Sequence, residues 1–263
     1  MDEYYSTLDR VFSSASSVYD KKILSNFINV NIREMELAAL IEFSRDRNRI
    51  LEVGCGTGEE ASRFIRSAQK NLICIDAALG MVEYSTEKMR TLGISEKFSA
   101  LKLPAYRVGE LNMIFDLVYS LNGALNTEPR LDLFVRTLEK ILPEGGIIII
   151  SLRNRLCLGE FLLYSVLGRL EPLKRRKARS TPVQVVGNTI ESFYYSPEEI
   201  GRVFSNFVLR KKIGLGILVP PYLADRFRSN LIRRIITSTE RLISRIPILS
   251  SLGDEVLYVF EKR

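Results

Sequence analysis

The stretch Ile50-Leu51-Glu52-Val53-Gly54-Cys55-Gly56-Thr57-Gly58 decides the fold. An apolar β-strand pattern runs directly into three closely spaced glycines, and residues 59–69 then have the pattern of a helix. A glycine-rich turn between a strand and a helix lets the backbone bend sharply and lets a ligand approach it closely. Glu59 and Glu60 stand where a pyrophosphate would rest, so the loop favours a nucleoside ligand without phosphates.

The rest of the first half alternates strand and helix patterns, which is typical of a parallel sheet with helices on both faces. Strands are expected at 49–53, 72–75, 98–102, 115–119 and 147–150, and helices at 59–69, 79–92 and 130–142. Four consecutive isoleucines, Ile147 to Ile150, predict a strand that is buried on both faces. Two later strands are expected at 207–213 and 255–260.

Asp76 closes the second expected strand, 22 residues after Gly54. A carboxylate at that point is placed to accept both ribose hydroxyls of a nucleoside held over the glycine loop. The alternative is that Asp76 simply caps the following helix, and the residues alone leave both interpretations open.

Composition excludes several classes of protein and chemistry. The chain has 263 residues, of which 46% are hydrophobic and 26% charged, as in ordinary globular proteins. It has no histidine, which excludes Ser-His-Asp and Cys-His catalysis and histidine-ligated metals. Cys55, Cys74 and Cys157 are not closely paired, so neither a disulfide framework nor a metal site is expected. A polar start and the lack of a long apolar run favour a reducing cytoplasm over secretion or membrane insertion.

Charge is distributed unevenly along the chain. Residues 1–150 have a net charge of −3, whereas residues 151–263 have a net charge of +10. The second half either lies near negative charge or uses its basic residues for solubility, and both interpretations stay open.

Four motifs carry a resemblance to a known family. They are the loop motif at 50–58, Ile75-Asp76-Ala77-Ala78-Leu79-Gly80-Met81-Val82, Phe115-Asp116-Leu117-Val118-Tyr119-Ser120 and Leu142-Pro143-Glu144-Gly145-Gly146. Together they resemble class I S-adenosylmethionine-dependent methyltransferases that act on small molecules. The resemblance implies S-adenosylmethionine as cofactor. It also implies an α/β, Rossmann-like sheet of seven mostly parallel strands, with helices on both faces and an antiparallel last strand.

The resemblance also implies roles for individual residues. In that family the glycine loop cradles the methionine part of the cofactor, the acid after the second strand binds the ribose, and a methionine packs beside the adenine. Tyr19 and Arg33, from an N-terminal segment that folds over the cofactor, are expected to approach the methionine carboxylate. Because no acid follows the third strand, backbone groups near Ala105 are expected to bind the adenine. The expected cofactor-binding residues are Tyr19, Arg33, Glu52, Gly54, Cys55, Gly56, Gly58, Asp76, Ala77, Met81, Ala105, Leu121 and Asn122.

The chain is expected to form a single methyltransferase domain, 1–263, with a cofactor-covering segment at 1–48 and lid insertions at 152–205 and 214–253. The first insertion has a helix pattern at 156–170, a basic run at 174–179, a hairpin with Gly187-Asn188 at its turn and a capping box at Ser196-Pro197-Glu198-Glu199. The second has a basic amphipathic helix pattern at 223–246. Because both insertions leave the carboxyl ends of strands, they are expected to cover the ligand site.

The lid sequence suggests what the acceptor is. Its apolar residues are Leu156, Phe161, Leu162, Leu163, Val166, Leu167, Phe227, Leu231, Ile235, Leu242 and Ile246, and arginines stand between them at 226, 228, 233, 234, 241 and 245. One interpretation is two amphipathic helices that pack on each other, with solvated arginines. The other is a small lipophilic acceptor with an anionic group, met at a membrane surface where such a helix would lie flat.

Other roles stay open. Asn122 and Asn126 either face the pocket or satisfy a turn, and Tyr194, Tyr195 and Tyr222 either orient an acceptor or pack in the core. No catalytic base is assigned. Two alternative functions remain: an RNA methyltransferase and a cofactor-binding regulatory protein without catalysis. Nucleic acid is the less favoured partner, because the basic residues alternate with aliphatic rather than stacking aromatic side chains.

Overall fold

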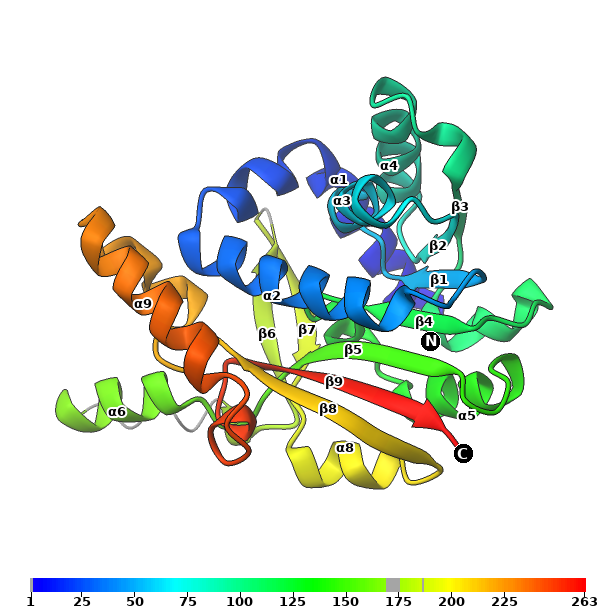
Figure 1. Ribbon diagram of the computed structural model, residues 1–263. Coiled ribbons are helices and arrows are strands. Elements are labelled where there is room, and N and C mark those ends of the chain that lie inside the picture. Colours follow the sequence, from blue (N-terminus) through cyan, green and yellow to red (C-terminus); the bar gives the residue numbers. More distant parts are fainter. Residues whose placement is uncertain (1, 169–175, 186) are drawn as a thin grey trace.

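A single seven-stranded sheet organises the protein, as the computed structural model in Figure 1 shows. The structure describes residues 2–168, 176–185 and 187–263. The strand order is β3-β2-β1-β4-β5-β9-β8. The strands are β1 (Ile50–Val53), β2 (Leu72–Asp76), β3 (Phe98–Lys102), β4 (Leu117–Ser120), β5 (Ile147–Arg153), β8 (Phe207–Leu215) and β9 (Glu255–Lys262). A separate hairpin consists of β6 (Ser180–Val185) and β7 (Asn188–Phe193).

Strand directions confirm the expected sheet. Strands β1 to β5 pair in parallel, whereas β9 pairs antiparallel with both β5 and β8. The last strand in the chain is therefore the one that runs against the others. The expected strand segments agree with the observed ones within a few residues. The fourth strand begins at Leu117 rather than Phe115, and β5, β8 and β9 extend two or three residues further than expected.

Helices cover both faces of the sheet. They are α1 (Asp2–Leu24), α2 (Phe27–Ser44), α3 (Glu59–Ala68), α4 (Leu79–Thr91), α5 (Leu131–Ile141), α6 (Leu158–Val166), α8 (Pro197–Val203) and α9 (Asn230–Ile243), with the short 3-10 helices η1 (Ser95–Lys97), η2 (Ala105–Leu111), η3 (Ala124–Thr127), η4 (Pro221–Arg226) and η5 (Leu249–Ser251). The capping box before α8 is present. None of the helices in the described residues is long and apolar enough to cross a bilayer.

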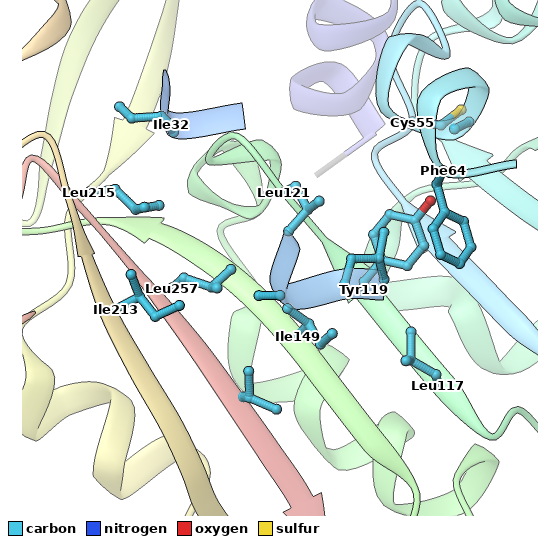
Figure 2. Close-up of a cluster of buried hydrophobic side chains, with 14 of the residues drawn as sticks. Ile32, Cys55, Phe64, Leu117, Tyr119, Leu121, Ile149, Ile213, Leu215 and Leu257 are labelled. Atoms are coloured by element: carbon cyan, nitrogen blue, oxygen red, sulfur yellow. The ribbon is translucent and has the colours of Figure 1, made fainter. Parts of the chain in front are cut away.

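The core has one cluster on each face of the sheet. Alternate residues of β5 show this division, because Ile147 and Ile149 join the cluster under α2 and α3, while Ile148 and Ile150 join the cluster under α5 and α8. Figure 2 shows the first cluster, in which the rings of Phe64 and Tyr119 meet edge to face at 5.9 Å between centroids. The prediction that the isoleucine strand is buried on both faces is confirmed.

The two insertions differ in detail from the expected pattern. The helix expected at 223–246 is wrong as one element, because Phe227 adopts an extended backbone (φ −103°, ψ 96°) and divides it into η4 and α9. The helix expected at 156–170 is shorter, spanning Leu158–Val166, and residues 169 and 170 lie outside the described residues. Of the basic run at 174–179, residues 174 and 175 also lie outside them. Both insertions begin at the carboxyl end of a parallel strand, which places them on the same edge of the sheet as the glycine loop.

Candidate cofactor and acceptor site

The glycine loop connects β1 to α3 and is fixed to the neighbouring strand β2. The amide groups of Gly54 and Cys55 donate to the carbonyl oxygen of Ile75 at 2.8 and 3.3 Å. A Cβ on Gly54 would lie 2.5 Å from the Cβ of Ala124, whereas a Cβ on Gly56, whose φ is +50°, would meet no atom within 4 Å. The loop is therefore packed tightly on one side and open at Gly56, where a ligand can approach the backbone.

Asp76 ends β2 beside this loop, and its carboxylate holds the loop in place. One oxygen accepts from the amide of Gly56 at 2.8 Å and the other from the amide of Ala78 at 2.9 Å. Burial raises the pKa of this carboxyl above its ordinary value. A carboxylate accepts about four hydrogen bonds, so two acceptor positions remain for ribose hydroxyls. Asp76 thus fixes the turn before α4 without being the N-cap of that helix, which is Ala78, and its role in the turn is compatible with ribose binding.

A cavity of about 190 Å³, which we call the first cavity, lies over the loop. Its wall contains nearly all of the expected cofactor-binding residues: Tyr19, Arg33, Glu52, Gly54, Cys55, Gly56, Asp76, Ala77, Met81, Ala105, Leu121 and Asn122. Gly58 is not in the wall. It packs against α4 instead, where an added Cβ would lie 2.9 Å from the Cβ of Ser85.

Helix α1 and the β6–β7 hairpin close the first cavity from above. Tyr5, Leu8 and Phe12 from α1 line it, and so do Val183 and Ile190 from the hairpin. Helix α1 is anchored on α4: the amide of Leu79 donates to an Asp9 carboxylate oxygen at 2.8 Å and the amide of Gly80 donates to the Ser13 hydroxyl at 2.8 Å. Helix α1 thus supplies the N-terminal cap that Ala78, at the start of α4, does not provide.

Two carboxyl groups, Glu52 and Glu60, line one side of the first cavity. Burial, reinforced by the nearby charge of Glu60, raises the pKa of Glu52 to about 8. Glu60 forms a buried ion pair with Arg33, and the thiol of Cys74 donates to Glu52 at 3.3 Å. Glu52 is thus mostly protonated near neutral pH and Glu60 is neutralised by Arg33, so this wall has little net charge; a bound cation would lower the pKa of Glu52 and ionise it.

The turn after β4 contains Asn122 and Asn126, and the two side chains have different roles. Asn122 has φ +55°, its amide donates to Glu36 at 3.1 Å, and it lines the first cavity. Asn126 lines no cavity and is structural, since its side chain binds the carbonyl of Phe193 in β7 and accepts from the amide of Arg153 at 3.0 Å. Burial, with the negative charge of Glu255 adding to it, raises the pKa of Glu36 to about 8.

A second cavity of about 520 Å³ adjoins the first. Residues that line both are Tyr19, Arg33, Asn122, Arg153 and Val183. The remaining wall comes mostly from the insertions, including Tyr164 of α6, Tyr194 and Tyr222. The hydroxyl of Tyr222 donates to Glu160 at 2.6 Å. Tyr195 lines neither cavity and packs against the core.

The arginines of the second cavity differ in how strongly they are neutralised. Arg176 is buried and paired with both Glu160 and Asp254, so this member of the basic run has a structural role. Arg153 has one weak ion pair, 3.7 Å from Glu255, and 41% of its side chain is exposed. Arg153 is therefore the cation at the junction of the cavities with the most capacity to bind an anionic group.

The site and the fold match known proteins. Residues 50–146 match the family model described as a methyltransferase domain. This part of the chain is similar to methyltransferase domains. The match covers the sheet from β1 to the start of β5, including the loop and Asp76. No protein with curated function shows significant sequence similarity to the chain.

Solved structures match the fold of nearly the whole chain. An S-adenosylmethionine-dependent methyltransferase from Clostridium acetobutylicum is 14% identical, with 94% of this chain and 96% of that one covered and a TM-score of 0.58. Magnesium protoporphyrin IX methyltransferase from Synechocystis, solved with bound S-adenosylhomocysteine, is 11% identical, with 90% and 86% covered and a TM-score of 0.57. A [4+2]-cyclase is 16% identical, with 85% and 80% covered and a TM-score of 0.53. The class I methyltransferase fold expected from the resemblance is confirmed.

Sequence reasoning missed Arg153, which lines both cavities, and Glu36, which accepts from the backbone amide of Asn122. Arg153 ends an apolar strand and belongs to no motif, although its place at the carboxyl end of a parallel strand was a usable signal. Glu36 lies inside an apolar helix pattern, and a single acid in such a pattern does not indicate a functional site. The hairpin belongs to the insertion 152–205, which was expected to cover the ligand site, and its residues Val183 and Ile190 line the first cavity.

Proposed function

We propose that the methyltransferase domain binds S-adenosylmethionine in the first cavity and catalyses methyl transfer to a small molecule in the second. The observation that carries this proposal is the junction of two cavities directly beside the glycine loop and Asp76. When bound, the cofactor supplies an electrophilic methyl group on a positively charged sulfur. Everything else that the reaction needs is alignment, which a chain without histidine can provide.

The residues present fit the cofactor. Asp76 has free acceptor positions for the ribose diol, and Met81 and Ala105 give the neighbouring wall an apolar character suited to adenine. Glu52 is the group proposed to meet the positive charge of the sulfonium or the α-amino group, since such a charge would lower its pKa and stabilise its ionised form. Arg33, which also lines this wall, is the proposed partner of the carboxylate.

The acceptor is proposed to be a small, partly lipophilic molecule whose polar part, anionic in our proposal, enters the second cavity. The wall there is formed by tyrosines and ionic groups, so the reacting end of the acceptor meets polar partners. Arg153 is the group proposed to bind its anionic charge. The apolar lid residues do not line this cavity, although Tyr164 and Tyr222 from the same insertions do. In this proposal the apolar residues contact the lipophilic part of the acceptor only at the outer rim of the cavity.

A cytoplasmic location is part of the same proposal. Cys55, Cys74 and Cys157 are free and buried, which suits a reducing compartment.

Calorimetry with S-adenosylhomocysteine tests the cofactor site. Asp76→Ala is expected to weaken binding at least about tenfold, because two hydrogen bonds to a charged acceptor are lost. Asp132→Ala, in an exposed position on α5, is the matched control and should bind like the wild type. Since Asp76 also holds the loop, the melting temperature of each variant without ligand is measured alongside. Unchanged affinity in a folded Asp76→Ala protein would disprove the site.

Turnover separates an enzyme from a cofactor-binding regulator. Cell extracts incubated with protein and radiolabelled S-adenosylmethionine are divided into lipid, small-molecule, RNA and protein fractions. We expect label in the lipid or small-molecule fraction, and less of it with Arg153→Met than with the control Arg210→Met, since Arg210 and its partner Glu261 line neither cavity. Label in the RNA fraction would favour the alternative function. Binding without label in any fraction would favour a regulator.

A further inference from the structure

Helix α9 presents an apolar stripe to solvent. Leu231, Ile235 and Leu242 lie four and seven residues apart, which places them on one face of the helix, and they are 68%, 56% and 76% exposed. The opposite face carries the contacts with the protein: Glu240 is buried and accepts from the amides of Ile217 and Leu218. A surface helix normally buries its apolar stripe. Here Ile236 of the inner face packs against the core, but the stripe of Leu231, Ile235 and Leu242 faces solvent.

Helix α6 and the segment after α9 extend the exposed apolar surface. Phe161, Leu162 and Val166 of α6 are exposed, Val166 to 86%, and so are Ile246 and Ile248. In Figure 1 both helices project from the same side of the molecule. The two amphipathic helices thus do not hide these side chains against each other, which removes the simpler of the two interpretations that the sequence left open.

Several arginines near the stripe form no ion pair in the part of the chain that the structure describes. Arg226, Arg228, Arg234 and Arg245 are exposed, and none of them has an ionic partner among the residues that the structure describes. Arg233 and Arg241 differ, because Arg233 donates to the carbonyl of Phe227 at 2.7 Å and Arg241 is paired with Glu34. We call the exposed apolar residues of α6, α9 and 246–248, with the four free arginines, the apolar–basic face.

We propose that the apolar–basic face docks on an anionic membrane surface, with α9 lying in the plane of the headgroups. Apolar side chains enter the acyl boundary while arginines at the same level meet lipid phosphates. A second copy of the chain is a poorer occupant, since a two-fold interface would place the same arginines against one another. Nucleic acid is also poorer, because an aliphatic stripe has no partner on a phosphate backbone.

The second cavity adds a functional reason for this orientation. Tyr164 of α6 and Tyr222 of η4 line it, their hydroxyls 3.4 Å apart, so the cavity wall belongs to the elements that carry the face or lead into it. Docking would bring the rim of the cavity to the membrane surface, where amphiphilic acceptors reside. This last step rests on the proposed function; the docking itself does not.

Vesicle co-sedimentation tests the docking. The full chain is mixed at low salt with vesicles of phosphatidylcholine alone or of phosphatidylcholine with phosphatidylglycerol. We expect binding to the anionic vesicles only, and weaker binding as salt is added. Arg234→Glu with Arg245→Glu should lower the partition coefficient by about 25-fold or more, since each arginine near such a surface is worth roughly fivefold. Leu231→Ser with Ile235→Ser and Leu242→Ser should abolish it.

Matched controls keep the test specific. Arg136→Glu with Arg202→Glu makes the same charge change on exposed positions of α5 and α8, and Leu92→Ser with Met113→Ser removes exposed apolar side chains elsewhere. Both should bind like the wild type, and all variants should melt like it because the altered side chains are exposed.

Several outcomes would overturn the docking proposal. They are no binding to anionic vesicles at low salt, equal losses in the control variants, a dimer that the stripe variant converts to a monomer, or retention on RNA that the arginine variant abolishes. Cofactor binding by calorimetry is measured on the same preparations, so a failure of docking is distinguishable from a failure of the proposed function.

Discussion

Buried carboxyls at the centre of the molecule are held partly protonated by their surroundings. Burial raises the pKa of Glu52 and of Glu36 to about 8, and that of Glu255 to about 7. In the unfolded chain each returns to an ordinary value near 4.3. The folded state therefore binds more protons than the unfolded state between these limits, and stability must decrease as the pH rises through that window.

Glu52→Gln tests this at a single residue. The raised folded pKa means that the contribution of Glu52 is fully present below about pH 4 and is lost as the pH approaches 8. The melting temperature of the wild type should fall between pH 5 and pH 8.5, and that of Glu52→Gln should fall less, because each pKa unit corresponds to about 1.4 kcal/mol. Calorimetric melts at several pH values measure it, with the exposed Glu87→Gln as control. Parallel pH profiles for Glu52→Gln and the wild type would contradict the assignment.

Single residues also show why part of the site escaped the sequence. The glycines and Asp76 can be recognised in the sequence because their spacing is fixed within one βαβ unit. The glycines stand where the chain must bend, and the carboxylate stands at the end of the next strand. Arg153, Glu36 and Asn126 act through contacts with residues far along the chain. Asn126, for example, binds Phe193 in the hairpin and Arg153 in β5. No local pattern encodes such contacts.

Helices and strands could be predicted from the sequence where their apolar face is buried against the sheet. In residues 50–150 the observed helices and strands agree closely with the hydrophobic periodicity, because every helix there packs against the same sheet. In the insertions the period still marked α9, but it could not tell which face the protein would bury. It also could not foresee that Phe227 would break the long helix, since 223–229 has no glycine and proline stands only before it.

Packing between α1 and α4 gives a prediction at the scale of elements. A Cβ on Gly80 would lie 2.8 Å from the Cα of Ser13, so Gly80→Ala must push α1 away from α4. We expect a loss of about 1–3 kcal/mol in stability and faster amide exchange in α1 than in the sheet. Gly201→Ala in α8 is the control, because its Cβ meets nothing within 4 Å and alanine favours the helix by about 0.5–1 kcal/mol. Equal exchange in α1 for both variants would show that α1 is not anchored there.

At the scale of the whole molecule, the domain and its insertions have separate tasks. The loops after β1, β2 and β4 line the first cavity together with α1 and the hairpin, and the hairpin, α6 and η4 line the second cavity beside it. The buried Arg176, held by Glu160 of α6 and Asp254 before β9, ties the first insertion to the sheet. An acceptor can thus change through the insertions while the cofactor site stays constant.

Helix α1 covers the first cavity with Tyr5, Leu8 and Phe12 and is anchored on α4 through Asp9 and Ser13. Thermodynamic linkage makes that arrangement reciprocal: whatever free energy a ligand gains from contact with α1, the helix gains in attachment when the ligand is present. The N-terminal helix is therefore expected to contribute to ligand affinity, and it also touches the glycine loop, since the hydroxyl of Thr57 donates to Asp20 of α1. A fusion tag that disturbs α1 would lower the measured affinity of an intact loop, so binding measurements on this protein call for a tag at the other end.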